Sequence, residues 1–247
     1  MRELVAVARF GGRLYWRDKV ALSTSVALSL GLGIGLPFMM AKVQPGAPGV
    51  LLDTHLGLLA MIMTLTAFMQ AAITLTARRD QLILKRMRAT GLNDREIIGG
   101  ELTNVAAQSV LLALVVCAVL YAGAGLQLPR NPLVLVLFVV VGAGVLALLG
   151  AAWTAVISRT EMAATMCMPW FLLAGVGAGG FGPVLQLLPS WVGTVLGVLP
   201  TSAIAEGARF AYTGEGDVVL ALLKLAAWAA IAFVTFRSRF RWEPRKS

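Results

Sequence analysis

The residues best placed to do chemistry lie in one charged stretch near the middle of the sequence. Five basic residues and one acid fall between Arg78 and Arg88, interleaved with apolar side chains. Such a stretch can form a short amphipathic helix that lies on a membrane or docks on a partner. Gly91 stands where this helix would end, and Asn93 and Asp94 can cap the next one. A solvated basic loop is the alternative that charge alone leaves open.

The sequence lacks the motifs of several common catalytic sites. It has no Gly-x-x-x-x-Gly-Lys-Ser/Thr phosphate loop, no His-Glu-x-x-His zinc motif and no Gly-x-Ser-x-Gly elbow. His55 is the only histidine, and Cys117 and Cys167 both lie inside apolar runs. We therefore expect no catalytic residue, metal or cofactor in this chain, and two cysteines that serve in packing.

The composition is that of an integral membrane protein. Hydrophobic residues make up 58% of the chain and charged residues 13%, whereas soluble domains carry about 25% charged residues. The net charge is +9, but the basic residues sit in short blocks beside apolar runs. This pattern favours a membrane topology signal over a nucleic-acid surface. We expect one all-α polytopic domain over residues 1–247.

Six apolar runs are long enough to cross a bilayer, which takes about 20 residues. The expected spans are Val20–Met40, Leu56–Ala77, Ile97–Leu126, Pro132–Ile157, Met162–Gly182 and Val218–Phe236. Spans 1 and 2 thus fall in residues 20–77, spans 3 to 5 in 97–182 and span 6 in 218–236. In span 5, Pro169 and four glycines between Gly175 and Gly180 predict a break or a loosened outer half.

The distribution of basic residues fixes the expected topology. Of 21 Lys and Arg residues, 17 fall before span 1, between spans 2 and 3, after span 4, or in the tail at 237–247. The positive-inside rule then places both termini in the cytoplasm, in a plasma (inner) membrane protein. Residues 1–19 predict an interfacial helix with Tyr15, Trp16 and Arg17 as anchors, although a loose basic tail has the same composition.

Polar residues inside the spans are candidates for contacts between helices or with a substrate. Thr66, Gln70 and Thr74 follow an i, i+4, i+8 spacing and share one face of span 2. A hydrogen-bonding role between helices is favoured over substrate contact. Glu101, near the start of span 3, can pair with an arginine of the central stretch or remain an ordinary interfacial carboxylate.

Residues 183–217 form a second unusual stretch, ahead of span 6. Pro183, Pro189 and Pro200 divide it into pieces too short to cross a bilayer. We expect re-entrant or interfacial half-helices on the outer side, with Trp191 among them, acting as a lid; an ordinary outer loop is the alternative.

Charged residues around this stretch predict two ion pairs. Glu206 and Arg209 are spaced i, i+3 and can pair at the rim of the outer segment. Lys224 lies inside span 6 and can either reach the outer surface or pair with a nearby acid, the candidates being Glu206, Glu215 and Asp217.

Two stretches carry a resemblance to a known family. The run "LILKRMRATGL" resembles the cytoplasmic segment between spans 2 and 3 of type-2 ABC exporter permeases. The run "FGPVLQLLPSWVGTVLGVLPTSAIAEGARFAYTGE" is similar to their outer segment before the last span, including Pro200, Thr201, Glu206, Gly207 and Arg209. Gly91 departs from the pattern, since members often have proline there, but both residues end a helix.

The resemblance implies that residues 78–96 contain the coupling helix that receives an ATPase subunit. The residues expected to contact it are Arg79, Asp80, Leu84, Lys85, Arg86, Met87, Arg88, Ala89, Thr90, Gly91 and Leu92. Two ATPase copies, which bind ATP and Mg, and a second permease, identical or not, are the implied partners. The chain resembles the short, drug-efflux-like members, so the implied substrate is hydrophobic or amphipathic.

Two other functions fit six spans. An ion-driven secondary transporter would need buried ionisable groups, and only Lys224 comes near this. A membrane enzyme or assembly factor would need polar catalytic side chains gathered at one depth, which the sequence does not contain. An ATPase encoded in a neighbouring reading frame would favour the permease over both.

Overall fold

The computed structural model describes residues 26–43, 49–180, 189–240 and 242, and every element in these ranges is a helix. Within the described ranges, four helices are long and apolar enough to cross a membrane: Val50–Asp80, Asp94–Gly123, Pro132–Trp153 and Val218–Arg239. Val26–Met39 is a shorter apolar helix. The interfacial helix expected at 1–19, with Tyr15, Trp16 and Arg17, and most of the tail lie outside the described residues.

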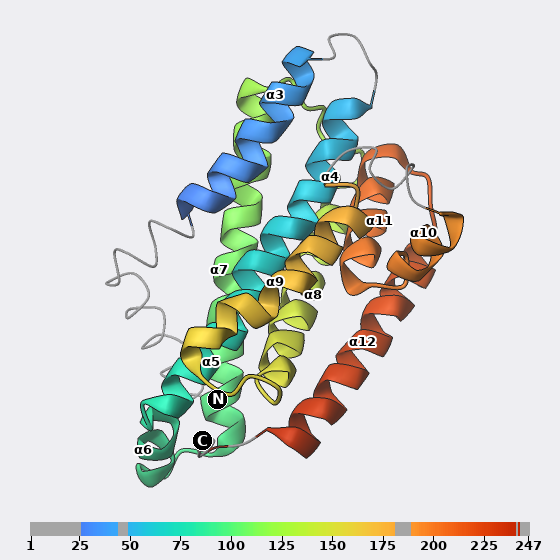
Figure 1. The fold of residues 1–247 in the computed structure, drawn as a ribbon. Coiled ribbons are helices and arrows are strands. Elements are labelled where there is room, and N and C mark those ends of the chain that lie inside the picture. Colours follow the sequence, from blue (N-terminus) through green and yellow to red (C-terminus); the bar gives the residue numbers. More distant parts are fainter. Residues whose placement is uncertain (1–25, 44–48, 181–188, 241, 243–247) are drawn as a thin grey trace.

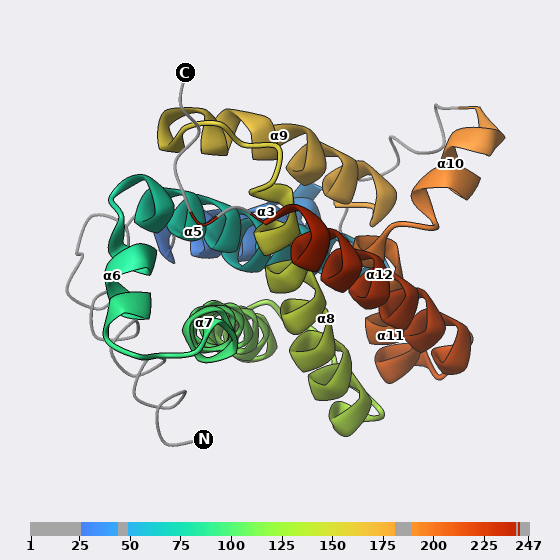
Figure 2. The ribbon, with the colours of Figure 1, turned by 90° about the horizontal axis from the view of Figure 1, so that it is seen from below.

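The helix Val50–Asp80 is the centre of the bundle. It consists of α4 (Val50–Met63), the π-helical segment η2 (Thr64–Met69) and α5 (Gln70–Asp80). In its most apolar 18-residue segment, 83% of the residues are buried. In the most apolar segment of the last long helix, Val218–Arg239, the share is 17%. Neighbouring helices surround this rod on several sides (Figures 1 and 2).

The surrounding helices pack along the central rod. They are α3 (Leu36–Val43), α7 (Asp94–Gly123), α8 (Pro132–Trp153), α9 (Thr160–Gly177) and α11 (Pro200–Thr213), whereas α12 (Val218–Arg239) packs on α8 and α11. Figure 2 shows α5 between α9 and α7, and α12 lying on α8. An aromatic cluster joins four elements: Trp170 of α9 lies 5.6 Å from Phe68, 5.6 Å from Trp153 and 6.2 Å from Trp228, between ring centroids.

Two short helices precede the last long one. α10 (Ser190–Leu196) follows Pro189, and α11 begins with Pro200. Proline at these positions fixes φ and costs no helical hydrogen bond, because the first N–H groups of a helix have no partner within it. A helix thus follows Pro189 and another begins at Pro200, whereas Pro183 lies outside the described residues.

Several helix bounds differ from the expected ones. The second span begins at Val50 and not at Leu56, so His55 is fully buried in a helix, outside any loop. Pro169 lies inside α9 and does not end it; the helix ends at Gly177, close to the glycines that predicted a loosened end. Both expected packing cysteines are free and buried.

Two π-helical segments interrupt the first two apolar helices. In η2 the hydroxyls of Thr64 and Thr66 donate to the carbonyls four residues earlier, at 2.9 and 2.8 Å. Such side-chain bonds compete with the backbone ladder and bend helices. In η1 (Gly31–Gly35), Gly33 packs against Ile62 and Val116, so close packing accompanies the irregular backbone.

Candidate functional site

The chain turns sharply between α5 and the short helix α6 (Ile83–Ala89), as Figure 1 shows. Leu82 in the turn has a positive φ of 58°, which is uncommon for a large side chain. Its N–H donates to the carbonyl of Arg79 at 3.0 Å, and Arg86 N–H donates to the carbonyl of Leu82 at 3.1 Å. This turn ends α5 and starts α6 in a new direction.

The side chains of α6 divide between two faces. Leu84 is fully buried and Met87 is half-buried, whereas Lys85, Arg86 and Ala89 are exposed. The stretch is therefore amphipathic, as predicted. Its buried face fixes α6 to the bundle, and its exposed face carries positive charge.

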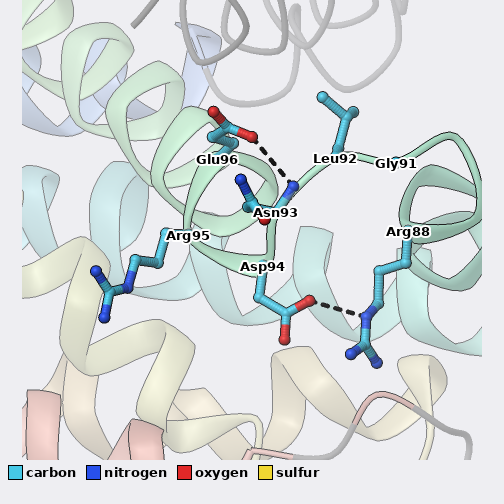
Figure 3. A pocket seen from close by; sticks show the side chains of 7 residues that line it. All are labelled: Arg88, Gly91, Leu92, Asn93, Asp94, Arg95 and Glu96. Atoms are coloured by element: carbon cyan, nitrogen blue, oxygen red, sulfur yellow. Dashed lines mark hydrogen bonds and ion pairs between the residues drawn. The ribbon is translucent and has the colours of Figure 1, made fainter.

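An open hollow of about 800 Å³ lies between the end of α6 and the start of α7. In Figure 3, Arg88 Nε lies 2.8 Å from Asp94 Oδ1, and Glu96 accepts a hydrogen bond from the N–H of Asn93 at 3.1 Å. Gly91 has a φ of 88°, which suits a residue without a Cβ. The predicted helix end at Gly91 and the predicted cap at Asn93 are both confirmed. The lining residues are Arg88, Gly91, Leu92, Asn93, Asp94, Arg95 and Glu96.

Arg79 anchors the base of α6 to a distant loop. Its side chain is buried, and its guanidinium donates to the carbonyls of Thr154, Ile157 and Ser158 at 3.2, 3.0 and 3.3 Å. These carbonyls follow the end of α8, where a helix leaves carbonyl groups without partners. A guanidinium suits this task because it presents several donors in one plane.

Asp80 contacts the other end of the same loop. Its carboxylate accepts from the N–H of Thr160 at 2.9 Å and from the Thr160 hydroxyl at 2.7 Å. Thr160 is the first residue of α9, where N–H groups lack partners and negative charge is favourable. Asp80 therefore supplies a cap for α9 from another helix.

Arg78 forms the third contact, with α7. It donates to Glu101, whose side chain is almost fully buried. The predicted pairing of Glu101 with an arginine of the central stretch is confirmed. Burial of Glu101 also makes the pair costly to break, because either partner alone would leave a charge out of water.

These contacts narrow the set of residues that can meet a partner. Arg79 and Leu84 are buried against their own chain, so both support α6 and present little surface outward. Of the residues expected to contact the ATPase, the exposed ones are Lys85, Arg86, Arg88, Ala89, Thr90 and Gly91, and Leu92 is half-buried.

Two ion pairs lie at the opposite end of the molecule from α6. One of them was predicted from the sequence, and the other replaces a predicted pair. Lys224 Nζ lies 2.8 Å from both carboxylate oxygens of Glu206, a pairing that was among those predicted. Arg209 instead pairs with Asp53 of α4 at 2.7 Å. The predicted Glu206–Arg209 pair is therefore wrong, because each side chain reaches across to another helix. Trp191 of α10 is exposed.

The polar face of the central helix forms a hydrogen bond with α7. Thr66 is buried, and its hydroxyl lies 2.7 Å from the Ser109 hydroxyl of α7. Gln70 and Thr74, further along the same helix, are half-buried. The favoured hydrogen-bonding role is confirmed for Thr66.

Comparison with known families decides the class of protein. A family model described as ABC-2 family transporter protein matches residues 49–236. This chain belongs to the ABC-2 transporter family. A search of curated proteins found no matching relative.

Membership makes the chain an ABC transporter permease, an integral membrane component that is not itself an enzyme. The matched range contains α6, the hollow beside it and all three anchoring contacts. The family implies an ABC transporter with an ATPase partner.

Sequence reasoning did not foresee that α6 contacts the segment after α12 in this ABC-2 permease. The Arg88 guanidinium carbon lies 4.5 Å from the ring centroid of Trp242, beyond the end of α12. The available signal was the aromatic series Phe236, Phe240 and Trp242, interspersed with arginines around the start of the basic tail.

Proposed function

We propose that this ABC-2 permease is the membrane subunit of an ATP-driven exporter for a hydrophobic or amphipathic substrate, such as a drug, an antibiotic or a lipid-like molecule. A separate ATPase subunit, which binds ATP and Mg, docks on α6 and the hollow next to it. The observation that carries the proposal is a short, positively charged helix held rigidly by Arg78, Arg79 and Asp80.

The proposed topology has six spans with both termini in the cytoplasm of a plasma-membrane protein. The four long helices supply four spans. α9 packs along both α4 and α5, so it would cross with them, and the helix from Val26 would cross beside α4. Contacts bring the basic residues of α5, α6 and the end of α12 together at one end, which the positive-inside rule assigns to the cytoplasm.

The docking proposal is tested by reversing charge on the exposed face of α6. Arg86→Glu and Ala89→Glu should lower the amount of ATPase subunit that co-purifies and abolish ATP-dependent transport. Replacing Leu84 would be uninformative, because its burial means that a charged residue there would disturb the fold.

The matched control for Arg86→Glu is Arg237→Glu, at an exposed position in the last turn of α12. It makes the same charge change away from α6 and should leave complex formation intact. Normal complex formation and transport in both α6 variants would rule out α6 as the docking site.

We propose a second permease copy packed against the first helix, with one ATPase per permease. Gly31 and Gly35 both face open space, and Leu28 and Met39 are exposed on the same helix. Small residues allow close helix approach in membranes. Gly31→Cys and Gly35→Cys should cross-link between copies, whereas Gly144→Cys, an equally open position on α8, should not. Cross-linking to a different permease would indicate a heterodimer.

The segment with α10 and α11 is proposed as an outer lid, and Gln70 and Thr74 as contacts of the pathway. Helices too short to span the membrane, together with exposed Trp191, support the lid.

A strict requirement for the ATPase subunit and ATP would separate this function from that of an ion-driven transporter, which would move substrate with an ion gradient alone.

A further inference from the structure

The end of α12 continues into a series of aromatic rings in tilted and edge-to-face contact that reaches α6. Ring centroids are 4.6 Å apart for Phe236 and Phe240, and 5.2 Å apart for Phe240 and Trp242. Trp242 in turn lies under the Arg88 guanidinium at 4.5 Å, in the geometry of a cation–π contact. We call Phe236, Phe240 and Trp242 the aromatic strap.

The strap rests on three other helices. Its rings pack against a buried cluster of Leu75 from α5, Ile98 from α7 and Ala151 from α8. Arg88 is also paired with Asp94 at the start of α7. The guanidinium is thus held between a ring of the strap and a carboxylate, so the strap contributes directly to the position of α6.

The opposite half of α12 holds the short helices. Lys224 Nζ donates to Glu206 of α11 and, at 3.0 Å, to the carbonyl of Gly197, just after α10. One turn further along, Trp228 Nε1 donates to the carbonyl of Val198 at 2.8 Å. The connection between α10 and α11 is therefore bonded to α12 through two side chains.

From these two sets of contacts we infer that α12 transmits movement of α6 to the α10–α11 segment, with Trp242 and Lys224 as positioning residues near its two ends. An α-helix of 22 residues is about 33 Å long. α12 buries only one face, through Ala221, Leu225 and Ala232, so the bundle does not enclose it. This inference rests on the proposed function, since the ATPase would supply the movement.

The test uses the full complex with a reporter cysteine at Val195→Cys, an exposed position on α10. The rate of labelling by a membrane-impermeant maleimide is measured without nucleotide and in an ATP-trapped state. In the parent complex the two rates should differ about five-fold or more, the lower end of typical allosteric coupling.

Trp242→Ala and Lys224→Gln should each abolish this difference while the ATPase subunit still binds and hydrolyses ATP. Trp242→Phe retains a ring over Arg88 and should restore it. Phe233→Ala, which truncates an exposed aromatic residue of the same helix, should leave it unchanged.

The outcomes separate the two proposals. Failure of any ATPase subunit to bind the parent permease would overturn the proposed function and this inference together. A bound, active ATPase with labelling that does not respond to ATP, or that responds equally in the parent, Trp242→Ala and Lys224→Gln complexes, would overturn only the inference.

Discussion

Asp80 of α5 accepts two hydrogen bonds from Thr160 of α9, one from its N–H at 2.9 Å and one from its hydroxyl at 2.7 Å. The adjacent Arg79 donates to carbonyls at the start of the same loop. Two neighbouring residues of opposite charge thus satisfy the donors at the beginning of one helix and the acceptors after the end of another. Through this loop, α6 is attached to α8 and α9.

Asp80→Asn should lower the free energy of unfolding by about 1–2 kcal/mol, because a charged cap is replaced by a neutral one. The measurement is unfolding in detergent, followed by tryptophan fluorescence. Glu161→Gln removes an exposed acid from the first turn of the same helix and should change stability by less than about 0.5 kcal/mol. Equal losses in the two variants would contradict the capping role.

Arg79→Lys should lower the free energy of unfolding by about 2–3 kcal/mol, although the positive charge is kept. A lysine ammonium cannot bond three carbonyls arranged for a planar guanidinium, so buried acceptors lose their partner. Arg86→Lys is the control, since Arg86 is exposed on α6. Similar melting temperatures for Arg79→Lys and the parent would show that the loop is held by other contacts.

Local chemistry predicted the surroundings of α6 well. A glycine after a basic turn and an Asn followed three residues later by Glu are sufficient to place a helix end and the next helix start. The pairing of Glu101 followed from an acid and several arginines at one membrane boundary. These features depend on residues close in the sequence or on a restricted membrane depth.

The features of the fold and the candidate site that the sequence did not predict depend on contacts between residues far apart in the chain. Arg79 is buried because its guanidinium binds carbonyls that lie 75 to 79 positions further along the chain. These distant carbonyls decide which side of the central stretch faces the bundle. The spacing of Glu206 and Arg209 is that of a helical ion pair, but Lys224 and Asp53 offer each of them a partner on another helix. The expected second span began at Leu56 and left His55 outside it, whereas the His55 ring nitrogen lies 3.4 Å from the Tyr212 hydroxyl inside the bundle.

The observed partner of Glu206 can be tested by exchanging charges. Glu206→Lys should impair transport, since it places a second cation beside Lys224. Adding Lys224→Glu should restore much of the lost activity, whereas adding Arg209→Glu should not. Rescue by Arg209→Glu would instead support the pairing expected from the sequence.

Asp53→Asn should cost only about 0.2–1 kcal/mol, because the Asp53–Arg209 pair is exposed.

Glu101→Ala should destabilise the protein by about 3–5 kcal/mol, as expected for a buried ion pair that loses one partner. Exchanging the residues, with Arg78→Glu and Glu101→Arg together, should recover part of this loss. Thr103→Ala, at an exposed position of the same helix, serves as the control for truncation. Thermal unfolding of these three variants and the parent in one detergent gives the comparison. Equal stability of Glu101→Ala and Thr103→Ala would mean that the pair contributes little.

Gly57→Ala should be the most damaging of the small substitutions in the central helix. A Cβ added at Gly57 would overlap the backbone of Gly180, just beyond the end of α9, and backbone cannot move aside as a flexible side chain can. Overpacking of this kind costs about 1–3 kcal/mol. Gly144→Ala, on α8, meets open space and should be neutral or stabilising by up to about 1 kcal/mol, since alanine favours a helix. Measured unfolding free energies that change equally in the two variants would mean that α4 and the end of α9 do not pack this closely.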